Sequence, residues 1–145
     1  MKYLFLPVSL LISLLLCTCE PESPIKQLRI ELRSGDVGRT STLSSSGTYL
    51  TRSLYKDFNI ANYPSASQIR FTAFISIGHP MHECILELVD LGDSTVIEGS
   101  ALTTNNTTGE WMESGNLLDA FPEKDLDLSL FIRSSLGGVE ASVRS

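Results

Sequence analysis

Apolar and polar residues alternate with a period of two over most of the chain after residue 27. The alternation is clearest in residues 68–77, where apolar side chains occupy every second position. This pattern is typical of a β-strand with one buried face. We therefore expect one set of side chains to face the core: Ile69, Phe71, Ala73, Ile75 and Ile77.

Further short segments carry strand patterns of the same kind. They span residues 27–33, 48–54, 83–91, 94–98, 110–114, 126–132 and 139–144. Residues 83–91 are almost continuously apolar, which predicts a central strand covered on both faces. Residues 34–47 and 101–109 are polar, and we expect loops there, with an irregular edge strand as the alternative for the first. Residues 116–121 predict a single helical turn, with Asn116 as its cap and Pro122 ending it.

About eight short strands separated by turns in about 120 residues predict an all-β fold, an antiparallel β-sandwich. The chain has no room for crossover helices, which excludes a parallel α/β sheet. Within residues 49–144, the order IRFTAFISI, CILELVDL, a strand with the single tryptophan, then LDLSLFIRS resembles a jelly-roll of the galactose-binding or carbohydrate-binding-module kind. The resemblance implies a non-catalytic binding domain. An immunoglobulin-like or transthyretin-like sandwich is the alternative.

The chain begins MKYLFLPVSLLISLLLCTC, with one lysine and then no charge until Glu20. This layout predicts a signal peptide, and the apolar run is short for a membrane span. Leu16-Cys17-Thr18-Cys19 resembles a bacterial lipobox, although Thr18 stands where Gly, Ala or Ser is usual. The resemblance implies removal of residues 1–18 and lipidation of Cys19, in the bacterial cell envelope and in particular the outer membrane. Lipidation of Cys17, with bulky Leu16 at the cleavage position, and an ordinary secretory leader are the alternatives.

After the leader we expect a proline-rich tether over residues 19–26 and one domain over residues 27–145. The 145 residues carry a net charge of −6, which argues against nucleic acid as a partner. With Cys17 removed and Cys19 lipidated, only Cys84 remains in the domain, so no internal disulfide forms. We expect Cys84 to be a small buried apolar residue, with Glu83 and Glu87 raising its pKa.

Two groups of residues are candidate metal ligands. His79 and His82 lie in one short turn and suit a transition metal, but a zinc site needs further ligands. Asp90 with Asp93, and Asp125 with Asp127, are candidates for a structural calcium ion, without EF-hand spacing. For both groups we favour solvated loops or complementary charged edges, and we expect no cofactor.

Trp111 is the candidate ligand-binding residue, with Tyr49, Tyr55 and Tyr63 as alternative exposed rings. We favour a core position for Trp111, because a small sandwich needs large core residues. In the alternative, its ring stacks on a sugar. The chain carries no sequence motif of a known catalytic site. We therefore expect an envelope-anchored, non-enzymatic module that binds a glycan or a protein partner. A structural or assembly subunit of an envelope or fimbrial complex is the alternative, and a small hydrolase the third possibility.

Overall fold

The computed structural model describes residues 39–50 and 54–144. The predicted leader, Cys17 and Cys19, the tether and the predicted strand at 27–33 lie outside the described residues. Within the described part of the chain, no helix is long and apolar enough to cross a membrane. Its helical segments are two 3₁₀ turns, η1 (Ile60–Asn62) and η2 (Leu118–Ala120).

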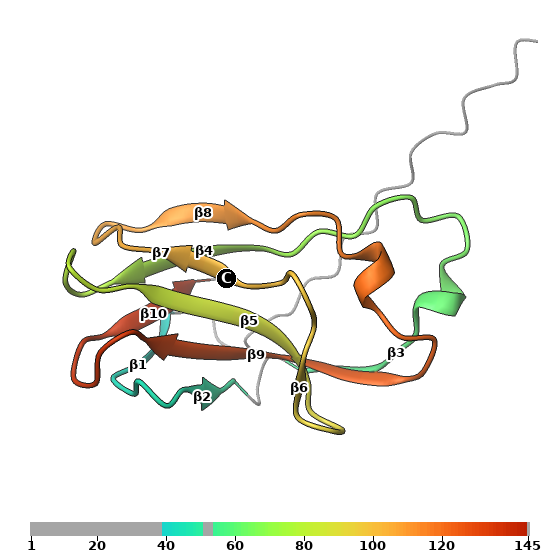
Figure 1. Cartoon of the computed structure of the whole chain (residues 1–145), viewed down its shortest axis with the longest axis horizontal. Helices are drawn as coiled ribbons and strands as arrows, with labels where there is room; N and C mark the ends of the chain where they lie inside the picture. Colours follow the sequence, from blue (N-terminus) through green and yellow to red (C-terminus); the bar gives the residue numbers. More distant parts are fainter. Residues whose placement is uncertain (1–38, 51–53, 145) are drawn as a thin grey trace, which may run out of the picture.

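The strands form two sheets that pack face to face (Figure 1). The four-stranded sheet has the order β1-β10-β4-β8, with β1 Arg39–Thr42, β10 Ala141–Arg144, β4 Thr72–Ile77 and β8 Glu110–Glu113. The other sheet has β9 (Leu126–Ser134) and β5 (Cys84–Asp90) at its centre. Beside β9 lie β2 (Thr48–Tyr49) and β3 (Tyr55–Phe58), and beside β5 lie β6 (Thr95–Val96) and β7 (Leu102–Thr104).

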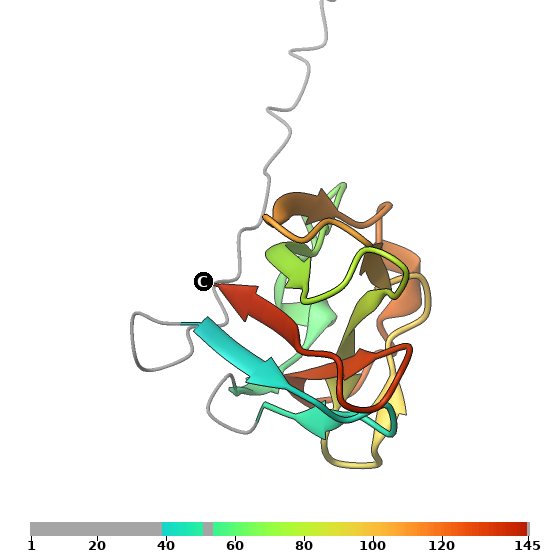
Figure 2. The same ribbon diagram turned by 90° about the vertical axis from the view of Figure 1, so that its left-hand side faces the viewer.

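The strand order is that of a jelly-roll. Since β2 and β3 both pair with β9, and β6 and β7 both pair with β5, each couple counts as one interrupted strand. The eight resulting strands follow the orders 1-8-3-6 and 2-7-4-5, and every pairing is antiparallel. Figure 2 shows β1 beside β10, so that the first and last of the described strands pair at one edge of this sheet. The predicted antiparallel jelly-roll sandwich is confirmed.

The core lies between the two sheets and has the predicted alternation. All five side chains expected to face it from residues 69–77 are buried. The opposing sheet contributes alternate residues of β9: Leu126, Leu128, Leu130 and Ile132. Because side chains alternate across a strand, the intervening residues of both strands point away from the core. These outward positions form the two outer faces of the sandwich.

Three local predictions have distinct outcomes. The helical turn is confirmed as η2, but its N-cap residue is Leu117 and not the predicted Asn116, whose Oδ1 accepts a hydrogen bond from Leu118 N at 3.1 Å. β5 is central, and on its outer side Val89 is buried whereas Ile85 and Glu87 are only half buried, so the prediction of cover on both faces is wrong in part. The loop predicted at 101–109 is also wrong in part, because Leu102 inserts into the core and β7 pairs with β5.

Candidate ligand-binding face

Trp111 lies on the outer face of the four-stranded sheet, so the core position favoured from the sequence is wrong. Its side chain is 66% exposed. On β8 the neighbouring Met112 faces inward, opposite the buried Ala73, and packs against the core. The alternation of the strand then turns Trp111 outward. The core position that the tryptophan was expected to fill is thus taken by a methionine.

Trp111 belongs to a row of residues that crosses three strands. The register pairs Arg144 of β10 with Phe74 of β4, and Phe74 with Trp111 of β8. The Phe74 and Trp111 rings meet edge to face, with centroids 5.7 Å apart and an interplanar angle of 76°. The Arg144 guanidinium carbon lies over the Phe74 ring, 5.6 Å from the ring centre. We call Arg144, Phe74 and Trp111 the outer row.

The half-buried Phe74 ring rests on the backbone of Gly109, just before β8. A Cβ atom placed on Gly109 would lie 2.3 Å from Phe74 Cε1, closer than real Cβ contacts, and Gly109 has φ +88°. Glycine adopts this backbone conformation without the strain that other residues incur. The absence of a side chain there leaves the space that the phenylalanine ring fills.

An ion pair borders the outer row. Glu113, two residues after Trp111 on β8, faces the same side and pairs with Arg70. Both side chains are partly exposed, at 41% for Arg70 and 47% for Glu113. The negative charge beside Trp111 is therefore compensated within the protein. No carboxylate of the described residues forms an ion pair with Arg144.

The three candidate tyrosines lie away from Trp111. Tyr49, on β2 of the other sheet, is 43% exposed and its ring contacts Phe131 at a centroid distance of 4.8 Å. Tyr55 and Tyr63 are half buried against the core, with their hydroxyl oxygens 3.4 Å apart. This hydrogen bond and the partial burial raise the pKa of Tyr63. Of the three, Tyr49 alone presents an exposed ring.

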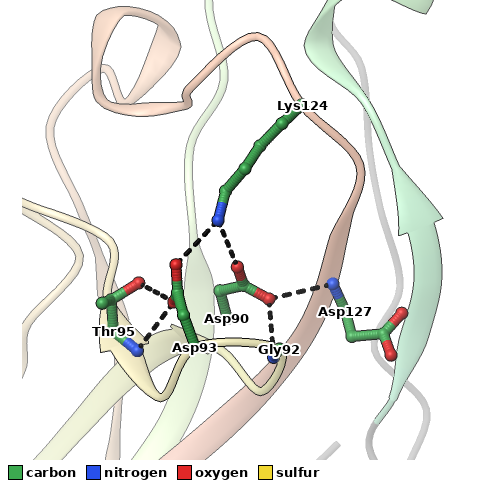
Figure 3. Close-up of polar contacts among 6 residues, drawn as sticks. All are labelled: Asp90, Gly92, Asp93, Thr95, Lys124 and Asp127. Atoms are coloured by element: carbon green, nitrogen blue, oxygen red, sulfur yellow. Dashed lines mark hydrogen bonds and ion pairs between the residues drawn. The ribbon is translucent and has the colours of Figure 1, made fainter.

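The structure brings Asp90 and Asp93 together around an ammonium group (Figure 3). Lys124 Nζ donates to Asp90 Oδ2 at 3.1 Å and to Asp93 Oδ2 at 2.7 Å. The other oxygen of the buried Asp90 accepts from the backbone nitrogens of Gly92 and Asp127, at 3.0 and 3.1 Å. These bonds tie the β5–β6 turn to the start of β9.

The charges of this cluster stabilise each other. The hydrogen bond from Lys124 lowers the pKa of Asp93 to about 2, and the contacts with Asp93 and Asp90 raise the pKa of Lys124. Lysine thus occupies the position between the two carboxylates that the calcium hypothesis assigns to a metal ion.

The remaining metal candidates make contacts of their own. Asp125 Oδ1 accepts from the Asn59 side chain at 2.9 Å, and Asp127 Oδ1 accepts from Asp57 N at 3.4 Å. His79 and His82 are close, with ring centroids 5.4 Å apart. Among residues 39–50 and 54–144, no group of three or more His, Cys, Asp or Glu side chains is placed to hold a metal ion.

Cys84 is fully buried at the start of β5. Burial raises the pKa of its thiol to about 11, partly offset by backbone hydrogen bonds. The predicted direction of the pKa shift is correct. Its main cause, however, is the removal of the thiol from water, and not the neighbouring glutamates that the sequence suggested. The thiol lies in the core and is separate from the outer row.

Phe74 and Arg144 are members of the row that the sequence did not single out. A signal for Phe74 was present, because it is the one aromatic residue on the otherwise polar side of residues 68–77. Arg144 carries no comparable signal, since its place beside Phe74 follows from the pairing of β10 with β4.

Comparison with protein-family models, with curated proteins and with solved structures gave no match for this chain.

Proposed function

We propose that the protein is a lipid-anchored bacterial envelope protein whose jelly-roll domain binds a glycan without catalysing a reaction. The glycan would bind on the outer face of the four-stranded sheet, with one sugar ring stacked on Trp111. Cys19 would carry the lipid, after removal of residues 1–18.

The exposure of Trp111 is the observation that carries the binding proposal. An indole ring that is 66% exposed contributes little to the core, yet contact with Phe74 restricts its position. Aromatic residues of this kind are enriched at binding surfaces, because they offer a large apolar area at a small entropic cost. The C–H groups of a sugar ring are a suitable partner for such an area. Thr72 and Glu113 lie next to it and offer groups that can bind sugar hydroxyls.

Tyr49 provides a matched control for the binding experiment. The full chain and its Trp111→Ala and Tyr49→Ala variants would be titrated with a panel of soluble oligosaccharides by isothermal calorimetry. We expect Trp111→Ala to weaken binding at least tenfold, about 1.4 kcal/mol, and Tyr49→Ala to leave it unchanged. In the unmodified chain, the fluorescence of the single tryptophan should change on binding. Failure of the whole panel to bind would refute the glycan proposal.

The anchor is tested separately by intact mass. The protein recovered from membranes of its native host should have the mass of residues 19–145 plus diacylglycerol and acyl chains. A Cys19→Ala variant should lack that addition, whereas a Cys17→Ala variant should keep it. An unlipidated protein that starts at another residue would refute the anchor and leave the binding proposal in place.

The competing function is an assembly subunit that pairs an edge strand with another chain. β1 and β8 are the outer strands of the four-stranded sheet among the described residues, which gives this function a route through strand addition. A stoichiometric protein partner that still copurifies with the Trp111→Ala variant would favour it.

A further inference from the structure

We infer that the glycan is acidic, and that Arg144 binds the carboxylate of a uronic acid while Trp111 stacks on a neighbouring sugar. This inference rests on the proposed function and specifies the class of its ligand. It follows from the charge and the spacing of the outer row.

Arg144 is an exposed cation that the folded protein leaves available. Its guanidinium lies over the Phe74 ring, and no described carboxylate or carbonyl oxygen accepts a hydrogen bond from it. A guanidinium has five N–H donors, and a cation–π contact with a ring does not use them as hydrogen-bond donors to oxygen. The contact with Phe74 therefore holds the cation in place and leaves its donors free for a ligand.

A carboxylate fits these donors better than a neutral hydroxyl group. Arginine binds a carboxylate through two parallel hydrogen bonds, which gives both affinity and a fixed orientation. Repulsion from Glu113, a carboxylate on this face, is reduced because Glu113 is paired with Arg70. An anion can thus approach the outer row even though the chain as a whole carries a charge of −6.

The spacing of the row suits two adjacent sugars. Arg144 and Trp111 flank Phe74 on its two neighbouring strands. The guanidinium carbon and the indole centre lie 5.6 and 5.7 Å from the centre of the Phe74 ring, so they are at most about 11 Å apart. A disaccharide has about this length. One ring can therefore lie on Trp111 while the carboxylate of the next reaches the Arg144 guanidinium over Phe74.

The test compares oligogalacturonate with its fully methyl-esterified form, which has the same rings without the charge. We expect the full chain to bind the acid form about tenfold more tightly, and Arg144→Gln to abolish that difference. Arg144→Lys should retain part of it, because lysine keeps the charge without the paired donors. Trp111→Ala should weaken both ligands. Added salt should weaken only the acid form.

The results separate this inference from the proposed function. Binding of neutral oligosaccharides that depends on Trp111, without preference for the acid form, would overturn the inference and leave the glycan proposal intact. A preference for the acid form that survives in Arg144→Gln would also overturn it, as would tighter binding of a sulfated galactan that lacks uronate. Absence of binding to every sugar would refute the proposed function itself.

Discussion

Substitution of Gly109 by alanine tests the geometry that holds Trp111 in place. The new Cβ would lie 2.3 and 2.6 Å from two atoms of the Phe74 ring, so the ring must move. Phe74 is the contact of Trp111 on one side and of Arg144 on the other. A shift of its ring should therefore disturb all three residues of the outer row.

Gly109→Ala has two costs, the strained backbone conformation and the overlap with Phe74, and a second glycine separates them. Gly138 has φ +85°, close to the +88° of Gly109, but a Cβ there would have no atom within 4 Å. Gly138→Ala should cost about 1 kcal/mol, for the backbone conformation alone. Gly109→Ala carries the same cost plus about 1–3 kcal/mol for overpacking against the ring. We expect its free energy of unfolding to fall by about 2–4 kcal/mol in total.

Urea unfolding followed by circular dichroism measures both losses, and the emission of the single tryptophan reports the local change. In a Phe74→Ala background, the cost of Gly109→Ala should fall to that of Gly138→Ala, because the obstructing ring is gone. Equal losses for the two glycine variants in the unmodified background, with unchanged Trp111 emission, would refute the packing of Phe74 on Gly109.

Three further predictions concern residues outside the outer row. Asp90→Ala should lower the free energy of unfolding by about 2–4 kcal/mol, because it removes three hydrogen bonds to a buried carboxylate, two from backbone nitrogens and one from Lys124. Asp93→Ala should cost less, since Asp93 is exposed; equal losses in urea unfolding would contradict this. Asp93 has a folded pKa of about 2 against 3.8 unfolded, so its contribution is present above pH 3.8 and lost toward pH 2. The stability difference between the unmodified chain and Asp93→Asn should shrink over that range, and a constant difference would count against it. Cys84, with a pKa of about 11, should resist iodoacetamide in the folded protein and react in urea, as peptide mass spectrometry would show; equal labelling in both states would contradict its burial.

The fold was predictable because its strands alternate strongly. In residues 69–77 every second side chain is apolar, and a shift of the strand register by one residue would expose all of them. The short strand β7 was missed for the opposite reason. Its sequence Leu-Thr-Thr has one apolar residue, Leu102, and therefore shows no alternation. Its strand conformation depends on pairing with β5, which the local sequence does not reveal.

The site was less predictable, because alternation identifies the inner face of a strand and leaves the outer face open. In β8 both Trp111 and Met112 are apolar, so the sequence of β8 alone does not decide which one enters the core. The pairing with β4 decides it, since Met112 lies opposite Ala73. The ion pairs of Asp90 and Asp93 were not predictable either, because Lys124 reaches both from another loop.

The contacts around Trp111 support the proposed binding of a ligand at this ring. A scattered exposed hydrophobic residue is ordinary on a protein surface and needs no explanation. Here, however, Gly109 leaves space for Phe74, and the Phe74 ring contacts both Trp111 and the Arg144 guanidinium. Phe74, from a strand distant in the sequence, thus contacts a ring that remains 66% exposed, and Gly109 and Arg144 in turn contact Phe74. Contacts that order an exposed ring in advance reduce the entropy lost when a ligand binds to it, and this reduction favours binding on the outer face.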